Sequence, residues 1–150
     1  VYGPAGRPDM APFRFAEWCL REEEIQLFGD GKQSRDFTHV DDIALGTIAA
    51  LQKRLPGFEI INLGGGGERT TLLEMIEMIG EFAGKEPIIK FLPVAQGDMS
   101  HTHASIEKAR EQLNWEPLTT LQSGLSATVT RHRVARELFA DCKICDTEFE

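Results

Sequence analysis

The chain has 150 residues, of which 41% are apolar, and its formal net charge is −8. This length fits a single domain that is large enough to bury a hydrophobic core. The acidic balance argues against a general binder of nucleic acids or membrane surfaces, because such proteins need a basic face. It does not exclude an anionic small-molecule ligand, since one or two arginines can dominate a local site.

Three cysteines do not form a disulfide framework in a chain of this length, which favours a reducing, cytoplasmic environment. No apolar run approaches ~20 residues and no secretory signal is present, so we expect no membrane anchor. The sequence begins at Val1, inside what resembles a strand-to-loop motif. We interpret this beginning as a truncation.

The first part of the chain predicts a helix, a strand and a tight turn. Apolar residues at helical spacing indicate a first helix that begins near Pro12. Residues 25–28 have the composition of a short strand, and the two glycines of residues 29–31 suit a turn at positive φ. Residues 35–40 are the return segment after this turn.

The next predicted helix starts at Asp41 and Asp42 and ends at Pro56 and Gly57. The two carboxylates suit the positive end of the helix dipole, and we interpret them as helix caps rather than catalytic groups. Apolar or small residues recur at steps of three and four along one face: Ile43, Ala44, Thr47, Ile48 and Leu51. A strand is predicted over residues 59–63.

The remaining elements continue the same alternation. A capping box at residues 71–74 begins a helix that Gly84 ends. We expect a strand over residues 87–92, a short helix over 105–113 and a last helix over 120–139. Helices and short strands that alternate in this way indicate one α/β unit.

Two motifs carry a resemblance to a known family. Residues 32–44, KQSRDFTHVDDIA, and residues 1–11, VYGPAGRPDMA, resemble segments of the extended short-chain dehydrogenases/reductases, which epimerise or dehydrate nucleotide sugars with bound NAD. The opening motif is most similar to the UDP-glucuronate 4-epimerase group, and the resemblance extends over roughly residues 1–130. It implies a C-terminal nucleotide-sugar-binding domain over residues 1–139, truncated at its start, followed by a polar tail at 140–150.

The resemblance also shows what is missing. In this family NAD oxidises C4 of the sugar, and the tyrosine of a Tyr-x-x-x-Lys motif acts as the base. This chain has no Gly-rich dinucleotide fingerprint at its start, and its one tyrosine, Tyr2, has no lysine four residues on. The Rossmann domain is therefore expected to be missing, as a separate N-terminal half. We expect the chain alone to bind no NAD and to catalyse nothing.

The family pattern assigns five substrate-binding residues. Arg35 corresponds to the arginine that binds the pyrophosphate, and Arg7 to the arginine that faces the carboxylate of an acidic sugar. Phe28 and Gln33 correspond to an aromatic residue and a glutamine that lie against the nucleotide. Asp98 is a weaker candidate, with a loop-structuring or capping role as its alternative. Phe28 is equally consistent with a strand core residue.

Further positions qualify this assignment. Arg7 could instead pair with Asp9 in its own loop. The resemblance assigns contacts with the cofactor to Tyr2 and Pro4. Relatives often carry Arg-Pro-Gly-Asp where this chain has AQGD at residues 95–98, so a second phosphate-clamping arginine is absent there. Ser105 stands where an aspartate is usual before the helix, and both residue types cap helices well.

Other motifs favour structural interpretations. The glycines of residues 64–67 lie between a predicted strand and a helix, but they fit neither a dinucleotide fingerprint nor a P-loop, so we expect a flexible turn. The pair Cys142 and Cys145 lacks the partners of a zinc or redox site. His101 and His103 are expected to be solvated, and no metal site is predicted.

The sequence therefore predicts the substrate-binding portion of an NAD-dependent nucleotide-sugar epimerase of the UDP-glucuronate 4-epimerase type, with a UDP-sugar as ligand. A non-catalytic nucleotide-sugar-binding or interaction module and a fragment of a 4,6-dehydratase are the alternatives. Loss of the nucleotide domain should uncover apolar surface near Val1, Tyr2, Phe13 and Phe15. We therefore expect self-association, as a homodimer.

Overall fold

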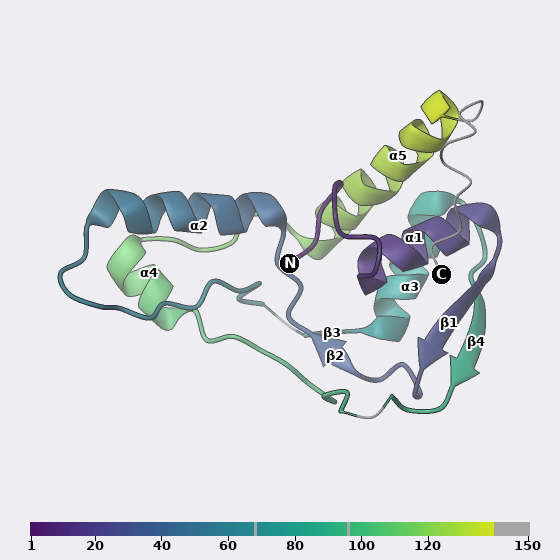
Figure 1. Cartoon of the computed structure of the whole chain (residues 1–150), viewed down its shortest axis with the longest axis horizontal. Helices are drawn as coiled ribbons and strands as arrows, with labels where there is room; N and C mark the ends of the chain where they lie inside the picture. Colours follow the sequence, from purple (N-terminus) through teal and green to yellow (C-terminus); the bar gives the residue numbers. More distant parts are fainter. Residues whose placement is uncertain (68, 96, 140–150) are drawn as a thin grey trace.

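The computed structural model describes residues 1–67, 69–95 and 97–139 (Figure 1). Helices and short strands alternate along them, as the sequence predicts. In chain order the elements are α1 (Ala11–Arg21), β1 (Glu24–Phe28), β2 (Ser34–Arg35), α2 (Val40–Lys53), β3 (Thr70–Thr71), α3 (Leu72–Ala83), β4 (Ile88–Leu92), α4 (Glu107–Leu113) and α5 (Leu121–Phe139).

Two hydrophobic clusters organise these elements. The larger cluster joins α1, α3 and α5 to β1, and its fully buried members include Ile25, Ile76 and Leu125. The smaller cluster joins α4 to α2 around Leu113 and Trp115. Figure 1 shows α2 and α4 at one end of the molecule and the larger cluster at the other. The short segment between β2 and α2 and the long segment between β4 and α4 connect the two ends.

The strands form two small sheets. β1 and β4 pair in parallel, with Glu24 opposite Ile88 and Phe28 opposite Leu92. β2 pairs antiparallel with β3. The turn after β1 has the predicted geometry, since the two glycines of residues 29–31 have φ values of 77° and 75°. The segment after the turn does not return along β1: its strand β2 pairs with β3, and β1 pairs with β4.

Both ends of α3 follow the predicted local chemistry. The α3 capping box is complete: Glu74 N donates to Thr71 Oγ1 at 3.2 Å, and Thr71 N donates to Glu74 Oε2 at 2.8 Å. This backbone hydrogen bond lowers the pKa of Glu74. Gly84 ends α3 with φ of 68°. The prediction for Ser105 is wrong, because α4 begins at Glu107 after an N-cap at Ile106 that makes no side-chain capping bond.

The start of α2 corrects another prediction. His39 is the N-cap, and its Nδ1 accepts a hydrogen bond from Asp41 N at 3.3 Å. Asp42 is not a cap: it is 2% exposed, and its carboxylate accepts hydrogen bonds from Leu118 N at 3.1 Å and Thr119 N at 3.0 Å. Both acidic residues still lie in the first turn, where the helix dipole favours them. Asp42 therefore ties the segment before α5 to α2.

The predicted apolar face of α2 points to solvent. Ile48 and Leu51 are 49% and 78% exposed, whereas the buried side of the helix holds Gly46 against Leu63 and Trp115. We define the α2 face by its exposed apolar residues, and nearby Phe58 and Ile60 are also exposed. The members of the α2 face are Val40, Leu45, Ile48 and Leu51.

The predicted strand over residues 59–63 is not formed. These residues have no ladder partner among the described residues, and a strand needs a neighbour to satisfy its backbone groups.

The prediction of exposed apolar surface near the N-terminus is also largely wrong. Tyr2 and Phe15 are 4% and 5% exposed, and Val1 alone of the named residues is mostly exposed. Exposed apolar residues lie on α2 instead, and others lie on β4 and at the end of α5.

None of the helices among the described residues is long and apolar enough to span a bilayer.

Candidate functional site

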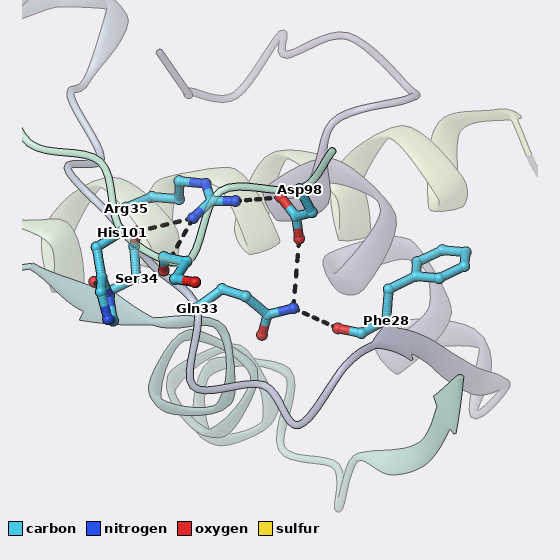
Figure 2. Close-up of polar contacts among 7 residues, drawn as sticks. Phe28, Gln33, Ser34, Arg35, Asp98 and His101 are labelled. Atoms are coloured by element: carbon cyan, nitrogen blue, oxygen red, sulfur yellow. Dashed lines mark hydrogen bonds and ion pairs between the residues drawn. The ribbon is translucent and has the colours of Figure 1, made fainter. Parts of the chain in front are cut away.

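Four of the five predicted substrate-binding residues meet where β1, β2 and the loop before α4 converge (Figure 2). Gln33 lies between Phe28 and Asp98: its Nε2 donates to Phe28 O at 2.5 Å and lies 3.5 Å from Asp98 Oδ2. Arg35 Nη2 donates to Asp98 Oδ1 at 2.6 Å. The two contacts of Asp98 link positions 65 and 63 residues apart in sequence, so the cluster is a product of the fold.

The backbone around β2 holds this cluster in place. Arg35 Nη1 donates to Ser34 O at 3.0 Å and lies 3.5 Å from Ser100 O. Ser34 N donates to Ser100 O at 2.9 Å, and Ser34 Oγ lies 2.8 Å from His101 Nδ1. The loop that carries Asp98 is therefore fixed along β2. Arg35 has five N–H donors, and these contacts leave some of them free for a ligand.

Two cavities lie beside the cluster and share Gln33 and Asp98 in their walls. The first has a volume of about 440 Å³ and is lined by Phe28, Arg14 and Trp18 among other residues. The second has a volume of about 810 Å³ and is lined by residues that include Lys32, Phe91, Val94 and His101. We call them the α1 cavity and the β4 cavity. The α1 cavity is of the size class that holds small ligands.

Arg35 lines neither cavity. Its side chain is 25% exposed and its Asp98 partner 28% exposed, so the pair is half-sheltered from water. A charge-assisted pair of this geometry orients both groups. Arg35 therefore positions the Asp98 carboxylate in the shared wall. Phosphate binding by Arg35 stays a prediction that depends on its remaining donors.

Arg7 lies in the loop before α1. Its Nη2 is 3.3 Å from Asp9 Oδ2 and 3.2 Å from Met10 Sδ, and both charged side chains are about 70% exposed. The alternative pairing within the loop is therefore present. Asp9 lines the α1 cavity, which places Arg7 two residues from its wall. Contact of Arg7 with a sugar carboxylate stays a prediction.

Phe28 is not a core residue. Ile25 and Leu27 on the same strand are fully buried, whereas Phe28 is 44% exposed and lines the α1 cavity. The strand alternation explains the difference, because Phe28 lies on the exposed face of β1 together with Glu24 and Gln26. Its exposed ring could stack on a planar ligand group, which is the arrangement that the nucleotide assignment requires.

The two predicted cofactor contacts lie in the N-terminal segment. Pro4 is half-buried in a turn, whereas Tyr2 is a core residue whose hydroxyl donates to Leu121 O at 3.4 Å and whose ring packs edge-on against Phe37 and His39. Burial, and to a lesser degree the nearby carboxylate of Asp42, raises the pKa of Tyr2 to about 12. Cofactor contact by Tyr2 and Pro4 stays a prediction.

The weaker motifs have structural explanations. In the described part of the chain, no group of three His, Cys, Asp or Glu side chains could hold a metal. His101 contacts Ser34, and His103 Nδ1 lies 3.6 Å from Asp36 Oδ2. A Cβ at Gly65 would clash with the Asp36 carboxylate and with the backbone oxygen of Phe37, so packing disfavours a side chain at this position. Cys142 and Cys145 lie outside the described residues.

Sequence reasoning missed two members of this region. Arg14 was not singled out, although its position on the first helix places it one turn before Trp18, where an arginine can stack on the ring. Ser34 was missed because its role depends on His101, which is 67 residues away. No local signal marks such a pair.

Comparisons with known proteins agree with the resemblance. The model of the NAD dependent epimerase/dehydratase family matches residues 1–64. A UDP-glucuronate 4-epimerase of Thermodesulfobacterium geofontis is 46% identical over 144 residues, which are 96% of this chain and 44% of that protein. UDP-glucuronic acid 4-epimerase from Bacillus cereus, in complex with UDP-glucuronic acid and NAD, superposes with a TM-score of 0.85 at 38% identity, over 90% of this chain and 43% of that one.

A neutral-sugar enzyme is also similar. The UDP-glucose 4-epimerase from Thermotoga maritima, with UDP-glucose, superposes with a TM-score of 0.80 at 35% identity, over 90% of this chain and 44% of that one. The chain thus spans less than half the length of the relatives it matches. The predicted fold class is confirmed, and the described residues hold no Rossmann domain. The chain is therefore related, in sequence and in structure, to the C-terminal part of the nucleotide-sugar epimerases of the NAD dependent epimerase/dehydratase family.

Proposed function

We propose that this chain is the substrate-binding part of an NAD-dependent UDP-glucuronate 4-epimerase. The observation that carries the proposal is the convergence of Phe28, Gln33 and Asp98 at the α1 cavity, where Arg35 pairs with Asp98. The chain is also 46% identical to a UDP-glucuronate 4-epimerase. These residues were assigned to the nucleotide sugar from their motifs alone, and the fold brings them together.

Each residue has a distinct role in this proposal. Phe28 stacks on the nucleotide base, and Gln33 holds the backbone of Phe28 while it offers polar atoms to the ligand. Arg35 binds the diphosphate with its free donors and keeps Asp98 in the wall. Arg7 leaves Asp9 and pairs with the sugar carboxylate, since the exposed loop pair costs little to break. The carboxylate of an acidic sugar compensates the charge of Arg7, whereas a neutral sugar does not.

The proton-transfer step lies outside this chain. A tyrosine that acts as a base needs a lowered pKa and access to the substrate. Tyr2, the one tyrosine of the sequence, has its pKa raised to about 12 and its hydroxyl directed to Leu121 O. NAD, when bound by the rest of the enzyme, would supply hydride transfer at C4. This chain binds and orients the sugar, and alone it is inactive.

The rest of the enzyme docks on the α2 face. This surface is apolar, and a monomer rarely leaves such a surface uncovered. Residues 59–63 have the composition of a strand but no strand partner among the described residues. Relatives contain more than twice the matched length, which is sufficient for a separate cofactor-binding domain. That domain would cover the α2 face and pair with residues 59–63.

The proposal is tested by titrating UDP-glucuronate and UDP-glucose into the 150-residue chain and following backbone amide resonances. We expect both ligands to shift signals of Gln33 and Asp98, and UDP-glucuronate alone to shift signals of Arg7. Shifts that are scattered over α5 and absent from the α1 cavity would contradict the proposal. Equal responses of Arg7 to both ligands would favour an enzyme of neutral sugars.

A further inference from the structure

Arg14 is a cation in the wall of the α1 cavity that the family pattern does not assign. It lies on α1, and it lines the cavity together with Phe28, Gln33 and Asp98. Its guanidinium carbon lies 4.3 Å from the centroid of the Trp18 ring, one helical turn further on. Such stacking holds the guanidinium plane in place by a cation–π interaction. It occupies the face of the guanidinium and leaves its edge donors free.

The charges around this cavity make Arg14 distinctive. Within residues 1–67, 69–95 and 97–139, its guanidinium makes no hydrogen bond and no ion pair. The two carboxylates of the cavity wall are both engaged: Asp9 pairs with Arg7, and Asp98 pairs with Arg35. Arg14 is therefore the uncompensated positive charge of this wall.

A neighbouring position makes room for a ligand beside this charge. Ala95 lines the same cavity and contributes neither charge nor hydrogen-bond donors from its side chain. Phe28, which lines the same cavity, presents an exposed aromatic ring. An anion attached to an aromatic base would complement both residues: the base would lie on Phe28 and the anion beside Arg14. Nucleoside diphosphates have this combination of groups.

We infer that Arg14 binds the diphosphate of the nucleotide sugar, as a second arginine beside Arg35. The inference rests on the proposed function and adds a residue to its site. A guanidinium edge matches two oxygens of a phosphate group. The charge of Arg35 is already offset by Asp98, so Arg14 supplies the net positive charge that an anionic ligand requires.

The test is a titration of UDP and of uridine into the full 150-residue chain and its Arg14→Gln variant. The readouts are the dissociation constant and the indole N–H resonance of Trp18, which is one of two tryptophans in the sequence. We expect Arg14→Gln to weaken the binding of UDP roughly tenfold, which is the scale for one half-exposed, charge-assisted contact. The affinity for uridine should be unchanged. UDP, but not uridine, should shift the Trp18 signal in the unmodified chain.

Two further variants separate the role of the guanidinium fork from charge alone. Arg14→Lys keeps the charge without the planar fork and should recover only part of the affinity for UDP. Arg131→Gln makes the same charge change on the exposed side of α5, outside the cavity wall, and should leave UDP affinity unchanged.

The outcomes distinguish this inference from the proposed function. Two results would overturn the role of Arg14 while the proposed function survives. In the first, the unmodified chain and Arg14→Gln bind UDP equally well. In the second, Arg14→Gln loses affinity for UDP and for uridine to the same extent. If the unmodified chain binds no UDP, both are overturned. A tenfold loss that is specific to UDP, with Arg131→Gln unaffected, supports Arg14 as a diphosphate ligand.

Discussion

Asp98 and Arg35 form an ion pair of 2.6 Å across 63 positions of sequence, at the point where the loop before α4 meets β2. The pair explains why Arg35 lies behind the cavity wall while Asp98 is part of it. It also means that any change of Arg35 alters Asp98 as well. The two residues must therefore be tested together.

Arg35→Ala should weaken the binding of a UDP-sugar by ~2–4 kcal/mol, because it removes a diphosphate donor and leaves the Asp98 carboxylate unpaired near the ligand. Calorimetry on an enzyme that contains this chain together with a cofactor-binding domain measures the loss. Asp98→Asn is the matched control, since it keeps Arg35 and removes the neighbouring negative charge. An unchanged dissociation constant for Arg35→Ala would remove this residue from the site.

Arg7→Ala should weaken the binding of UDP-glucuronate much more than the binding of UDP-glucose, because only the first ligand offers a carboxylate to the guanidinium. The comparison of the two dissociation constants in the same enzyme measures this selectivity. Asp9→Asn breaks the loop ion pair but keeps Arg7, so it should preserve the preference for the acidic sugar. Equal losses for both sugars after Arg7→Ala would make Arg7 a loop residue.

Because of Glu17, the free energy of unfolding should depend on pH in the acid range. His132 Nδ1 lies 3.1 Å from its carboxylate and Arg21 Nε 2.7 Å, and Arg136 lies 3.8 Å away. The hydrogen bond from His132 is the largest cause that lowers the pKa of Glu17 to about 2. A lowered pKa in the folded state gives stability that is complete above the ordinary pKa near 4.5 and is lost as the pH falls toward 2.

Glu17→Gln should therefore cost about 2 kcal/mol of unfolding free energy at pH 7, and this cost should shrink between pH 4.5 and pH 2. Urea unfolding of both proteins across this range is the measurement. Glu23→Gln is the matched control on the same surface, because its Arg21 contact is long, at 3.9 Å, and exposed. A cost that does not change with pH would show that Glu17 acts through packing alone.

The isolated chain should self-associate through the α2 face. Light scattering should give an apparent mass above 16.7 kDa that rises with protein concentration. Replacing Ile48 and Leu51 by glutamate should restore the monomer, because it places charges on the exposed apolar surface. Leu118→Glu, at a residue that is 75% exposed elsewhere on the molecule, should not. A monomeric unmodified chain at high concentration would contradict this prediction.

Features that depend on neighbouring residues were predictable from the sequence. The capping box of α3, its end at Gly84 and the glycine turn after β1 each depend on chemistry within a few positions, and all three are present. The gathering of Phe28, Gln33, Arg35 and Asp98 could be anticipated only through the family resemblance. Their local sequence does not indicate that a loop 63 residues away closes the site.

Features that depend on distant partners were predicted wrongly. Residues 59–63 have the composition of a strand, but composition does not supply a neighbouring strand. Asp42 resembles a helix cap, yet it binds the backbone near Leu118 across 76 positions. The sequence shows an apolar stripe on α2 but not what it faces, and among the described residues nothing covers it. In each case the sequence fixes the chemistry of the group while the tertiary fold determines its partner.

The most direct test of the central claim is a chimaera in which this chain replaces the corresponding 43% of the Bacillus cereus UDP-glucuronic acid 4-epimerase. The measurement is the conversion of UDP-glucuronate to its C4 epimer, compared with the conversion of UDP-glucose. We expect turnover of UDP-glucuronate in clear preference to UDP-glucose, and loss of this preference with Arg7→Ala. A folded chimaera that binds NAD but converts neither sugar, or converts UDP-glucose in preference, would contradict the assignment of this chain to an acidic nucleotide sugar.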